Sequence, residues 1–348
     1  MRVLITGNLG YIGPVVAGHL RRVWPGAVLL GMDPGFFAHC LTGVGALPER
    51  VLDAQWFADL RDVPAGALDG VDAVVNLAAI SNDPMGNQFE APTLEINHAA
   101  GIRLAEEAKR RGVRSFVFAS SCSVYGFADS EARTEASSLD PLTAYARSKV
   151  CAEQDLARLA DDRFTVTCLR FATACGWSDR LRLDLVLNDF VASAISTGSI
   201  QILSDGSPWR PLIHVNDMAR AIEWALSRPA SNGGTFLVIN AGSDPWNYQV
   251  RDLAQAVAAE FPSVQVSINA NAAPDRRSYR VDFRRFRELA PDHQPQVGLA
   301  EAIRGLKAGL VRMGFGDPDF RKSSLIRLHT LRSHLDAGRL DPEFRWNH

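Results

Sequence analysis

The chain of 348 residues is long enough for one large domain or two, and its 47% of apolar residues can bury a sizeable core. Its formal net charge of −2 gives no electrostatic reason to expect nucleic acid or an anionic membrane as a partner. Five cysteines, an odd number, include no CxxC pair and have no histidine at zinc-finger spacing. Neither a disulfide framework nor a metal site is therefore expected.

The N-terminus begins with a strand-like run and lacks the charged, apolar and small-residue regions of a secretory signal. No apolar run approaches the roughly 18 residues that a membrane-spanning helix needs. We therefore expect a cytoplasmic protein without a membrane partner. A secreted protein whose leader has been removed stays as the alternative.

Short apolar runs alternate with helix-like stretches in the first half of the chain. The runs are of the length and β-branched content typical of strands buried on both faces, and they span 3–6, 28–32, 73–79, 115–121 and 165–171. Helical patterns at 15–22 and 98–112 lie between them, and the second ends in basic residues and a glycine. This alternation predicts an α/β fold with a Rossmann-type, doubly wound parallel sheet.

The second half of the chain has a different pattern. Short strand-like runs follow at 200–203 and 236–240, and helical patterns follow at 252–261 and near the C-terminus at 328–340. We expect a Rossmann-type domain over 1–176, with segments near 210–242 returning to it. Residues 177–348 are expected to form mainly a smaller substrate domain and a C-terminal tail.

A glycine-rich loop, TGNLGYIG, occupies residues 6–13 between the first strand and the first helix. Glycines at 7, 10 and 13 allow backbone amides to approach a pyrophosphate at the start of a helix. Asp33 ends the second strand, 20 residues beyond Gly13, where a carboxylate accepts hydrogen bonds from the adenosine ribose and repels a 2′-phosphate. The loop therefore predicts NAD rather than NADP, although a βα turn that binds no phosphate is the alternative.

Tyr145 and Lys149 form a YxxxK pair, which places both side chains on one face of a predicted helix. An ammonium group one turn away lowers the pKa of a tyrosine and favours the phenolate. Such a tyrosine takes a proton from an alcohol while hydride leaves the same carbon. The alternative is two residues on a solvated helix face.

Small hydroxyl residues end the strand SFVFASS, 20 to 25 positions before Tyr145. Ser121 or Ser123 would reach the crevice at the carboxyl ends of the strands, where open α/β sheets bind their ligands. A hydroxyl there can bond the reacting oxygen of a substrate. Serines that only cap the strand end are the alternative.

Together these motifs resemble those of the extended short-chain dehydrogenase/reductases, and specifically the NAD-dependent nucleotide-sugar epimerase/dehydratase family. The stretches that carry the resemblance lie in the order typical of that family, at 6–13, Asp33, Asp59, Leu60, 76–79, Asn97, 120–126, 145–149, 169–176 and 209–221. The resemblance covers roughly residues 1–280. It implies a Rossmann domain with a smaller nucleotide-sugar domain, and a homodimer formed through helices that include the one with YxxxK.

The resemblance also implies roles for individual residues. Tyr145 would be the base, Ser121 its hydroxyl partner, and Lys149 the residue that bonds the nicotinamide ribose, so that these three are the implied catalytic residues. The implied contacts to NAD are Gly7, Gly10, Tyr11, Ile12, Gly13, Asp33, Asp59, Leu60, Leu77, Ala78, Ala79, Asn97, Ser120, Tyr145 and Lys149.

Six residues are implied contacts of a nucleotide-sugar substrate, namely Ser121, Cys122, Ser123, Asn188, Arg210 and Arg277. Arg210 matches the arginine that contacts the phosphates of the sugar nucleotide, and Arg277 and Asn188 are further candidates for the diphosphate. Surface salt bridges are the alternative for both arginines. Arg180 and Arg182 are weaker candidates, and His214 is interpreted as structural.

One departure from the family bears on the reaction. Family 4,6-dehydratases carry an Asp-Glu pair directly before VYG, where this chain has Cys122 and Ser123. Elimination of water then lacks its general acid and base. The sequence therefore favours an NAD-dependent epimerase acting at C4 of the sugar. A 4-ketoreductase or dehydrogenase, a dehydratase, and a non-catalytic dinucleotide sensor are the alternatives.

Overall fold

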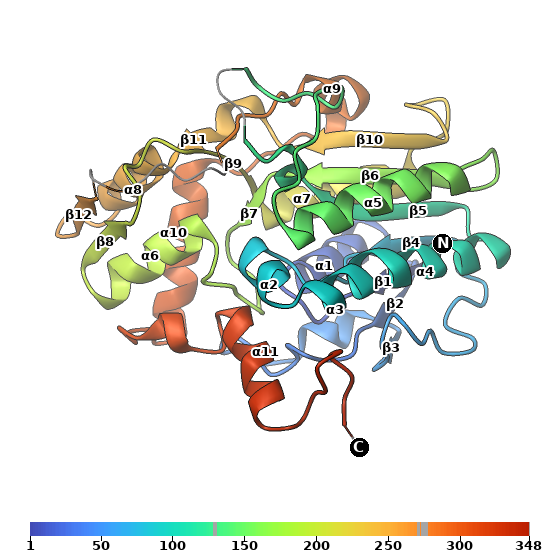
Figure 1. The fold of residues 1–348 in the computed structure, drawn as a ribbon, viewed down its shortest axis with the longest axis horizontal. Coiled ribbons are helices and arrows are strands. Elements are labelled where there is room, and N and C mark those ends of the chain that lie inside the picture. Colours follow the sequence, from blue (N-terminus) through green and yellow to red (C-terminus); the bar gives the residue numbers. More distant parts are fainter. Residues whose placement is uncertain (128–130, 270–271, 273–277, 348) are drawn as a thin grey trace.

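A seven-stranded parallel sheet forms the centre of the computed structural model, which describes residues 1–127, 131–269, 272 and 278–347 (Figure 1). The spatial order is β10-β6-β5-β4-β1-β2-β3, so the chain builds outward from β1 in both directions. The strands are β1 (Arg2–Thr6), β2 (Val28–Met32), β3 (Ala54–Trp56), β4 (Ala73–Asn76), β5 (Ser115–Ser121), β6 (Thr165–Phe171) and β10 (Phe236–Ala241). The predicted fold class, a Rossmann-type doubly wound sheet, is confirmed.

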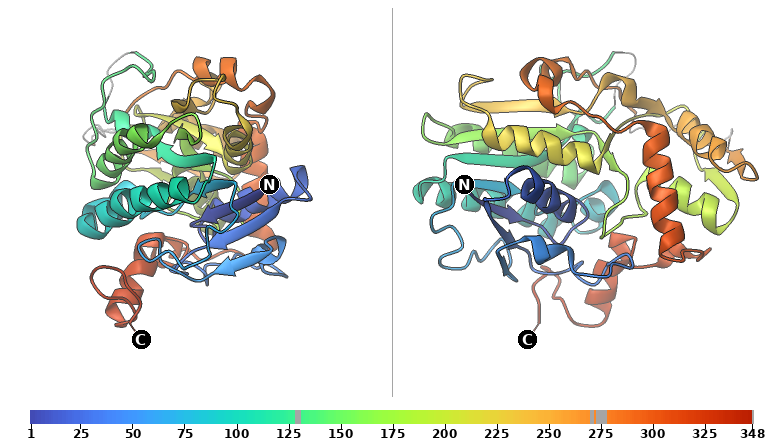
Figure 2. Two further views of the ribbon diagram at one scale, coloured as in Figure 1. Left: turned by 90° about the vertical axis from the view of Figure 1, so that its right-hand side faces the viewer. Right: turned by 180° about the vertical axis from the view of Figure 1, so that it is seen from behind.

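Helices cover both faces of the sheet and bury its apolar strands. On one face lie α4 (Gly101–Arg110) and α5 (Ala144–Leu159), which pack against each other (Figure 1). On the other face α1 (Gly13–Val23) packs against α7 (Val215–Ser227), as Figure 2 shows from behind. Both faces of the central strands are thereby removed from water, which explains their continuous apolar sequence.

A smaller lobe lies at the carboxyl ends of the strands (Figure 1). It holds a three-stranded sheet in the order β11-β9-β7 and a two-stranded sheet of β12 and β8. Its strands are β7 (Thr173–Cys175), β8 (Ser199–Ile202), β9 (Trp209–His214), β11 (Asn247–Gln249) and β12 (Gln265–Ile268). Its helices are α6 (Val186–Ser196), α8 (Val250–Ala259) and α10 (Leu299–Arg312), while the short α9 (Arg284–Leu289) packs against β10.

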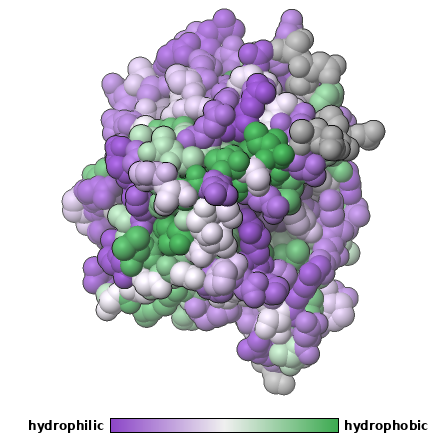
Figure 3. Space-filling model, turned by 90° about the vertical axis from the view of Figure 1, so that its left-hand side faces the viewer, coloured by the Kyte–Doolittle hydropathy of each residue, from purple (hydrophilic) through white to green (hydrophobic). Residues whose placement is uncertain are grey.

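The outer surface of the small lobe carries apolar side chains (Figure 3). Leu203, which follows β8 and lines the pocket described below, is 78% exposed, and Ile268, at the end of β12, is 42% exposed. The neighbouring positions of β8 alternate between exposed Gln201 and buried Ile202, as a two-stranded ribbon with one buried face requires.

The two halves of the sequence are interleaved in space. β10 pairs in parallel with β6, and α7 covers the same face as α1, although both elements follow the first lobe in the sequence. The C-terminal helix α11 (Arg327–Asp336) also returns to the large sheet. Its cluster of apolar side chains includes Leu331, Phe36 and Ile80.

Two differences between the observed elements and the sequence-based expectations lie in the large sheet. The run at 73–79 continues as a strand only to Asn76, because the backbone then turns into the pocket described below. The strand β3 was not expected, since Ala54, Gln55 and Trp56 form a half-exposed edge without an apolar run. Among the described residues, no helix is long and apolar enough to cross a membrane.

Candidate active site

A pocket of about 810 Å³ opens at the carboxyl ends of the parallel strands, between the sheet and the small lobe. This volume suits a ligand larger than a single sugar. Its walls come from the glycine loop, from the loops after β2, β3 and β4, from the start of α5 and from the small lobe. The predicted residues among them are Gly7, Gly10, Tyr11, Ile12, Asp33, Asp59, Leu60, Leu77, Ala78, Ala79, Ser120, Ser121, Ser123, Tyr145, Lys149 and Arg210.

The glycine loop is packed too closely to accept side chains. Gly7 has φ +70°, and a Cβ atom there would lie 2.5 Å from the backbone N of Ala78. A Cβ atom at Gly13 would lie 2.1 Å from the carbonyl oxygen of Asn8, although Gly13 does not itself line the pocket. The loop therefore leaves bare backbone facing the pocket just before α1 begins, the arrangement that suits a diphosphate.

Asp33 lies beside this loop at the end of β2 and is 8% exposed. Its carboxylate accepts hydrogen bonds from the backbone N of Leu9 at 3.1 Å and of Gly35 at 2.7 Å. Burial raises the pKa of Asp33 to about 6, and the two backbone N–H groups oppose that shift. Each carboxylate oxygen can accept further hydrogen bonds, so the glycine loop and Asp33 together fit the diphosphate and ribose of a dinucleotide.

Asn97 lies behind the pocket wall rather than in it. Its Oδ1 accepts a hydrogen bond from the backbone N of Ile80 at 2.7 Å, and its Nδ2 donates to the Ile80 carbonyl at 3.0 Å. The side chain is 1% exposed and also donates to Ser148 Oγ. Asn97 thus fixes the loop after β4, and the structure does not bring it among the residues that line the pocket.

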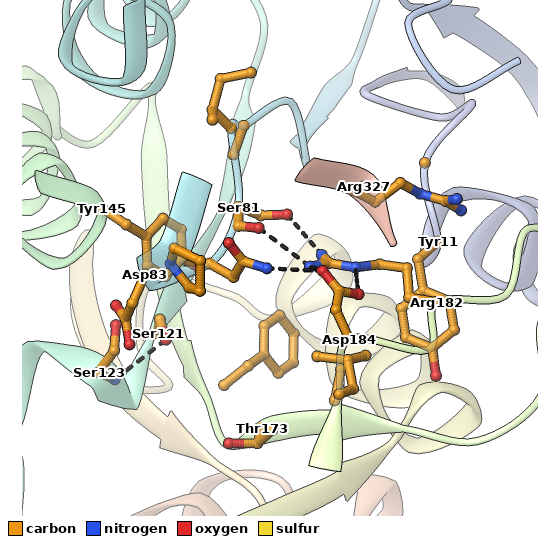
Figure 4. Close-up of a pocket in the computed structure, with 18 of the residues that line it drawn as sticks. Tyr11, Ser81, Asp83, Ser121, Ser123, Tyr145, Thr173, Arg182, Asp184 and Arg327 are labelled. Carbon is orange, nitrogen blue, oxygen red and sulfur yellow. Dashed lines mark hydrogen bonds and ion pairs between the residues drawn. The ribbon is translucent and has the colours of Figure 1, made fainter. Parts of the chain in front are cut away.

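Ser121, Tyr145 and Lys149 meet on one wall of the pocket (Figure 4 labels the first two). Ser121 ends β5, and Tyr145 lies in the first turn of α5, which Thr143 caps by accepting a hydrogen bond from the Ala146 N at 3.1 Å. The Ser121 hydroxyl lies near enough to Tyr145 to favour its phenolate, and it lowers the pKa of that tyrosine. Lys149 Nζ lies 5.6 Å from the centre of the Tyr145 ring and donates to the Ala119 carbonyl at 2.7 Å.

The pKa of Tyr145 moves in the direction opposite to the sequence-based expectation. Burial in the pocket raises it to about 12, while the nearby hydroxyl of Ser121 opposes the shift. Burial also lowers the pKa of Lys149 to about 8, and the nearby carboxylate of Glu153 opposes that change. Desolvation is therefore the largest influence on the pKa of Tyr145, and the expectation from the YxxxK spacing did not include it.

A buried ion pair supports this wall from behind. Glu153 lies one helical turn beyond Lys149, and its carboxylate accepts from Arg170 Nη2 at 2.6 Å and from Ser120 Oγ at 2.6 Å. Both charged side chains are 5% exposed. Because neither charge reaches water, each depends on the other, and the pair fixes α5 against β6.

Two predicted substrate residues lie outside the pocket lining. Cys122 is 1% exposed, its Sγ lies 3.1 Å from the Arg170 carbonyl, and burial raises the pKa of its thiol. Asn188 is fully buried, and its amide accepts from the Gly176 N while donating to Tyr11 Oη and to the Arg182 carbonyl. These groups are engaged inside the protein because the helical turn after β5 points Cys122 into the core and the first turn of α6 does the same for Asn188.

The two arginines predicted to contact phosphates differ in their outcome. Arg210, on β9, lines the pocket, and its Nη1 donates to the Trp209 carbonyl at 2.9 Å. Arg277 lies outside the described residues.

A polar cluster around Arg182, which the sequence offered only as a weaker candidate, forms the wall opposite Tyr145 (Figure 4). Arg182 donates to both carboxylate oxygens of Asp184, at 2.9 and 2.8 Å, and to Ser81 Oγ at 2.8 Å. Asn82 donates to Asp184 at 2.8 Å. Asn82 has φ 118°, a strained value for a residue with a side chain, and such strain persists only where neighbours hold it.

Asp83 was also not predicted, and it lies on the Tyr145 side of the pocket (Figure 4). Its Oδ1 accepts a hydrogen bond from Thr143 Oγ1 at 2.7 Å. Its charge raises the pKa of both Tyr145 and Tyr279. The only local signal was its place directly after Asn82, which caps α2 (Asp83–Gln88) by accepting from the Met85 N.

The sequence of the chain is similar to those of known nucleotide-sugar enzymes. The family model described as the NAD dependent epimerase/dehydratase family matches residues 3–242. An uncharacterized UDP-glucose epimerase of Bacillus subtilis, YtcB, is 30% identical over 248 residues, which cover 68% of this chain and 75% of that protein. The dTDP-glucose 4,6-dehydratase of Streptomyces griseus is 28% identical over 308 residues, 86% of this chain and 91% of that one.

Among solved structures, MoeE5 in complex with UDP-glucuronic acid and NAD superposes with a TM-score of 0.75. It is 26% identical, and the match covers 90% of this chain and 99% of that one. The family is NAD-dependent, so the cofactor predicted from the glycine loop and Asp33 is confirmed at the level of the family. The relatives include both epimerases and dehydratases, so the family alone does not distinguish between the two reactions.

Proposed function

Because the chain belongs to the NAD-dependent epimerase/dehydratase family, we propose that it is a nucleotide-sugar epimerase that inverts C4 of the sugar. The observation that carries the proposal is the meeting of Ser121, Tyr145 and Lys149 beside the glycine loop. A protein that only sensed a dinucleotide would have no need of a proton-transfer group there.

In this proposal the cofactor end is held by groups already described. Backbone amides near Gly7 and Gly10 would hold the diphosphate, Asp33 would accept from the adenosine ribose, and Lys149 would bond the nicotinamide ribose. When bound, NAD supplies a hydride acceptor and a positive charge close to Tyr145.

Tyr145 would take the proton of the sugar 4-hydroxyl as hydride leaves C4, and it would return that proton to the same oxygen as hydride comes back to the opposite face of the 4-keto sugar. The Ser121 hydroxyl holds the reacting oxygen and stabilises the phenolate of Tyr145. Since burial has raised the pKa of Tyr145 to about 12, the bound charges at the site must lower it during the reaction. Arg210 and the residues of the small lobe would contact the nucleotide diphosphate.

Dehydration is the second candidate, and Asp83 is the observation that favours it. Removal of the C5 proton from a 4-keto sugar needs a base, and Asp83 is a carboxylate on the Tyr145 side of the pocket. Elimination also needs an acid for the leaving hydroxyl, and Cys122 is buried outside the pocket with a raised pKa. Asp184, a second carboxylate of the pocket, is paired with Arg182 on the opposite wall. The Asp-Glu pair of the 4,6-dehydratases is replaced by Cys122 and Ser123, and this replacement favours epimerisation.

The test is a panel of UDP-, dTDP-, GDP- and CDP-sugars screened by thermal shift, followed by proton NMR of the best binder with NAD in D₂O. The proposal expects a C4 epimer, no accumulation of NADH and no deuterium at C5. Deuterium at C5 with loss of water would support the dehydratase instead. A stable keto sugar with stoichiometric NADH would show a dehydrogenase.

Tyr145→Phe is the matched variant for this test. It should lower turnover by about 10²- to 10⁴-fold while NAD still binds, because only the proton-transfer group is removed. Tyr248→Phe, on the small lobe at β11 and absent from the pocket lining, is the control and should keep its turnover. Retention of activity by Tyr145→Phe would overturn the assignment of the base.

A homodimer through α4 and α5 is a further part of the proposal. The outer surface of these helices carries ion pairs such as Arg110 with Glu107 on α4 and Arg158 with Asp155 on α5. Sedimentation velocity at several salt concentrations tests it, since an interface that includes such pairs weakens with salt.

A further inference from the structure

The last described stretch of the chain, residues 337–347, follows α11 and lies against the loops that follow β2 and β3. Figures 1 and 2 show it beyond α11, at the C-terminal end of the chain. We call it the C-terminal strap. It lies outside the part of the chain that the family model matches. Leu340 and Phe344 are its buried side chains, at 3% and 0% exposure.

The strap contacts the loop that follows β2 through a hydrogen bond and aromatic rings. Trp346 Nε1 donates to the Pro34 carbonyl at 2.6 Å. The Phe36 ring is in contact with two rings of the strap, Phe344 at 6.2 Å and Trp346 at 5.7 Å between centroids. Pro34 and Phe36 both line the pocket, directly beside Asp33.

The strap also contacts the loop that follows β3, through hydrogen bonds and an ion pair. Arg61 donates to the carbonyls of Glu343 at 2.6 Å and Phe344 at 2.9 Å, and Arg345 forms an ion pair with Asp62. Arg61 also donates to both carboxylate oxygens of Asp59, at 2.9 and 2.7 Å. Its side chain is 3% exposed, so this arginine is a fixed link between the strap and the pocket wall.

The path of the strap is specific. Phe344 has φ +62°, a value that costs free energy for a residue other than glycine, and its ring also packs against Phe89 at 4.9 Å. A segment that merely lay on the surface would relax to an unstrained conformation. The surrounding contacts therefore outweigh the strain and hold the strap in one position.

The strap contributes none of the described residues that line the pocket, yet it contacts the loops that carry Asp33, Pro34, Phe36 and Asp59. It therefore acts on the pocket from behind. Loops of this kind open by local unfolding when few contacts hold them, and the strap supplies contacts to two loops at once. Parting the loops requires the strap to detach.

We propose that the C-terminal strap positions the adenosine end of the cofactor site and makes NAD a resident cofactor that is released slowly compared with turnover. The inference rests on the proposed function, since an epimerase returns its hydride within each cycle and loses nothing when NAD stays bound. A reductase or dehydrogenase must exchange its cofactor every turnover, and a strap of this kind would slow it.

The experiment measures the release of NAD from the loaded full-length protein, by stopped-flow displacement with an excess of etheno-NAD and without any sugar. The variants are Trp346→Ala and Arg345→Ala, singly and together. The double variant should release NAD at least tenfold faster than the parent. An unchanged release rate in the double variant, or release by the parent as fast as its turnover, would overturn the proposal.

Two controls separate this role from a general contribution to stability. Leu253→Ala removes a fully buried side chain of α8 in the small lobe, and it should lower the melting temperature without faster NAD release. Arg339→Ala removes a strap arginine whose side chain donates to Ser333, and it should leave release unchanged. If the Leu253→Ala protein releases NAD as quickly as the strap variants, the strap is only a structural staple.

The outcome is independent of the sugar reaction. If NAD is released slowly in a way that depends on the strap but no epimer forms, the proposal for the strap stands and the proposed function is refuted. Epimer formation with fast, strap-independent release would do the reverse.

Discussion

The two ends of the pocket are built differently. At the cofactor end the walls are backbone, held by glycines such as Gly7, where a side chain would meet Ala78. At the sugar end the walls are side chains, and Arg182, Asp184 and Asn82 reach one cluster from two separate loops. Backbone contact restricts which residue can stand at a position, whereas a side-chain cluster can be assembled in many ways. The backbone walls of the cofactor end can therefore be predicted from sequence motifs, whereas the side-chain cluster at the sugar end cannot.

The largest effect is expected at the cofactor end. Gly7→Ala adds a Cβ atom 2.5 Å from the Ala78 N at a φ of +70°, so we expect a loss of about 3 kcal/mol or more in the free energy of unfolding and no measurable NAD binding. Denaturant unfolding and calorimetry measure the two quantities. The matched control is Gly18→Ala, on α1 with nothing within 4 Å of the added atom, which should be neutral or slightly stabilising.

At the sugar end, Arg182→Ala removes the main partner of Asp184. Because the Asp184 side chain is only 13% exposed, water cannot replace that partner, and the carboxylate is left poorly compensated in the pocket. We expect KM for the nucleotide sugar to rise by about 10- to 100-fold, with NAD affinity changed less than about twofold. Steady-state kinetics and NAD titration measure these effects. The Arg182→Ala/Asp184→Ala double variant should lose less than the sum of the single variants. An equal loss of NAD affinity would erase the distinction between the two ends.

The pKa of Asp33 gives a prediction with a defined sign. The pKa of Asp33 is raised from 3.8 to about 6 in the folded protein without cofactor. The contribution of Asp33 to the free energy of unfolding is therefore greatest below pH 4 and is lost as the pH rises through about 6. Without cofactor, Asp33→Asn should therefore gain on the order of 2 kcal/mol over the parent between pH 4 and pH 7. Denaturant unfolding at both pH values measures the difference. A constant difference across that range would contradict the assigned burial effect.

The smallest effect is expected from Asp83→Asn. The charge of Asp83 raises the pKa of Tyr145, so its removal should lower that pKa and move the rising limb of the pH–rate profile to lower pH. We expect the rate at neutral pH to change by less than about tenfold. Glu95→Gln, whose carboxylate is paired with Arg103 at the surface, is the control and should not move the limb. A profile that moves to higher pH would exclude Asp83 from the surroundings of the base.

The fold was predictable because burial on both faces leaves a strong sequence pattern. The runs that became β1, β2, β5 and β6 were located to within a residue or two. The half-exposed β3 has no such pattern, and it was missed. The motif residues that line the cofactor end were located because each motif reports a constraint on the backbone or on a helix face.

The site was less predictable where tertiary contacts decide the direction of a side chain. Asn97, Cys122 and Asn188 stand in family positions, yet the structure places them behind the wall, in hydrogen bonds within the protein. The pKa of Tyr145 could not be predicted from YxxxK spacing, since desolvation depends on the whole pocket. The strap has no motif, because it acts through rings and carbonyl groups that many sequences supply.

The position of β10 has a consequence for the synthesis of the chain. Residues Phe236–Ala241 form the outermost strand beside β6, in register from Phe236 opposite Val166 to Ala241 opposite Phe171. A nascent chain that has emerged only to residue 176 exposes the whole edge of β6, an edge that readily pairs with another chain. Residues 1–176 therefore cannot complete the large sheet during synthesis until β10 has been made. A gene cut at residue 176 should yield aggregates, whereas one cut within a surface loop beyond β10 keeps β6 paired with β10.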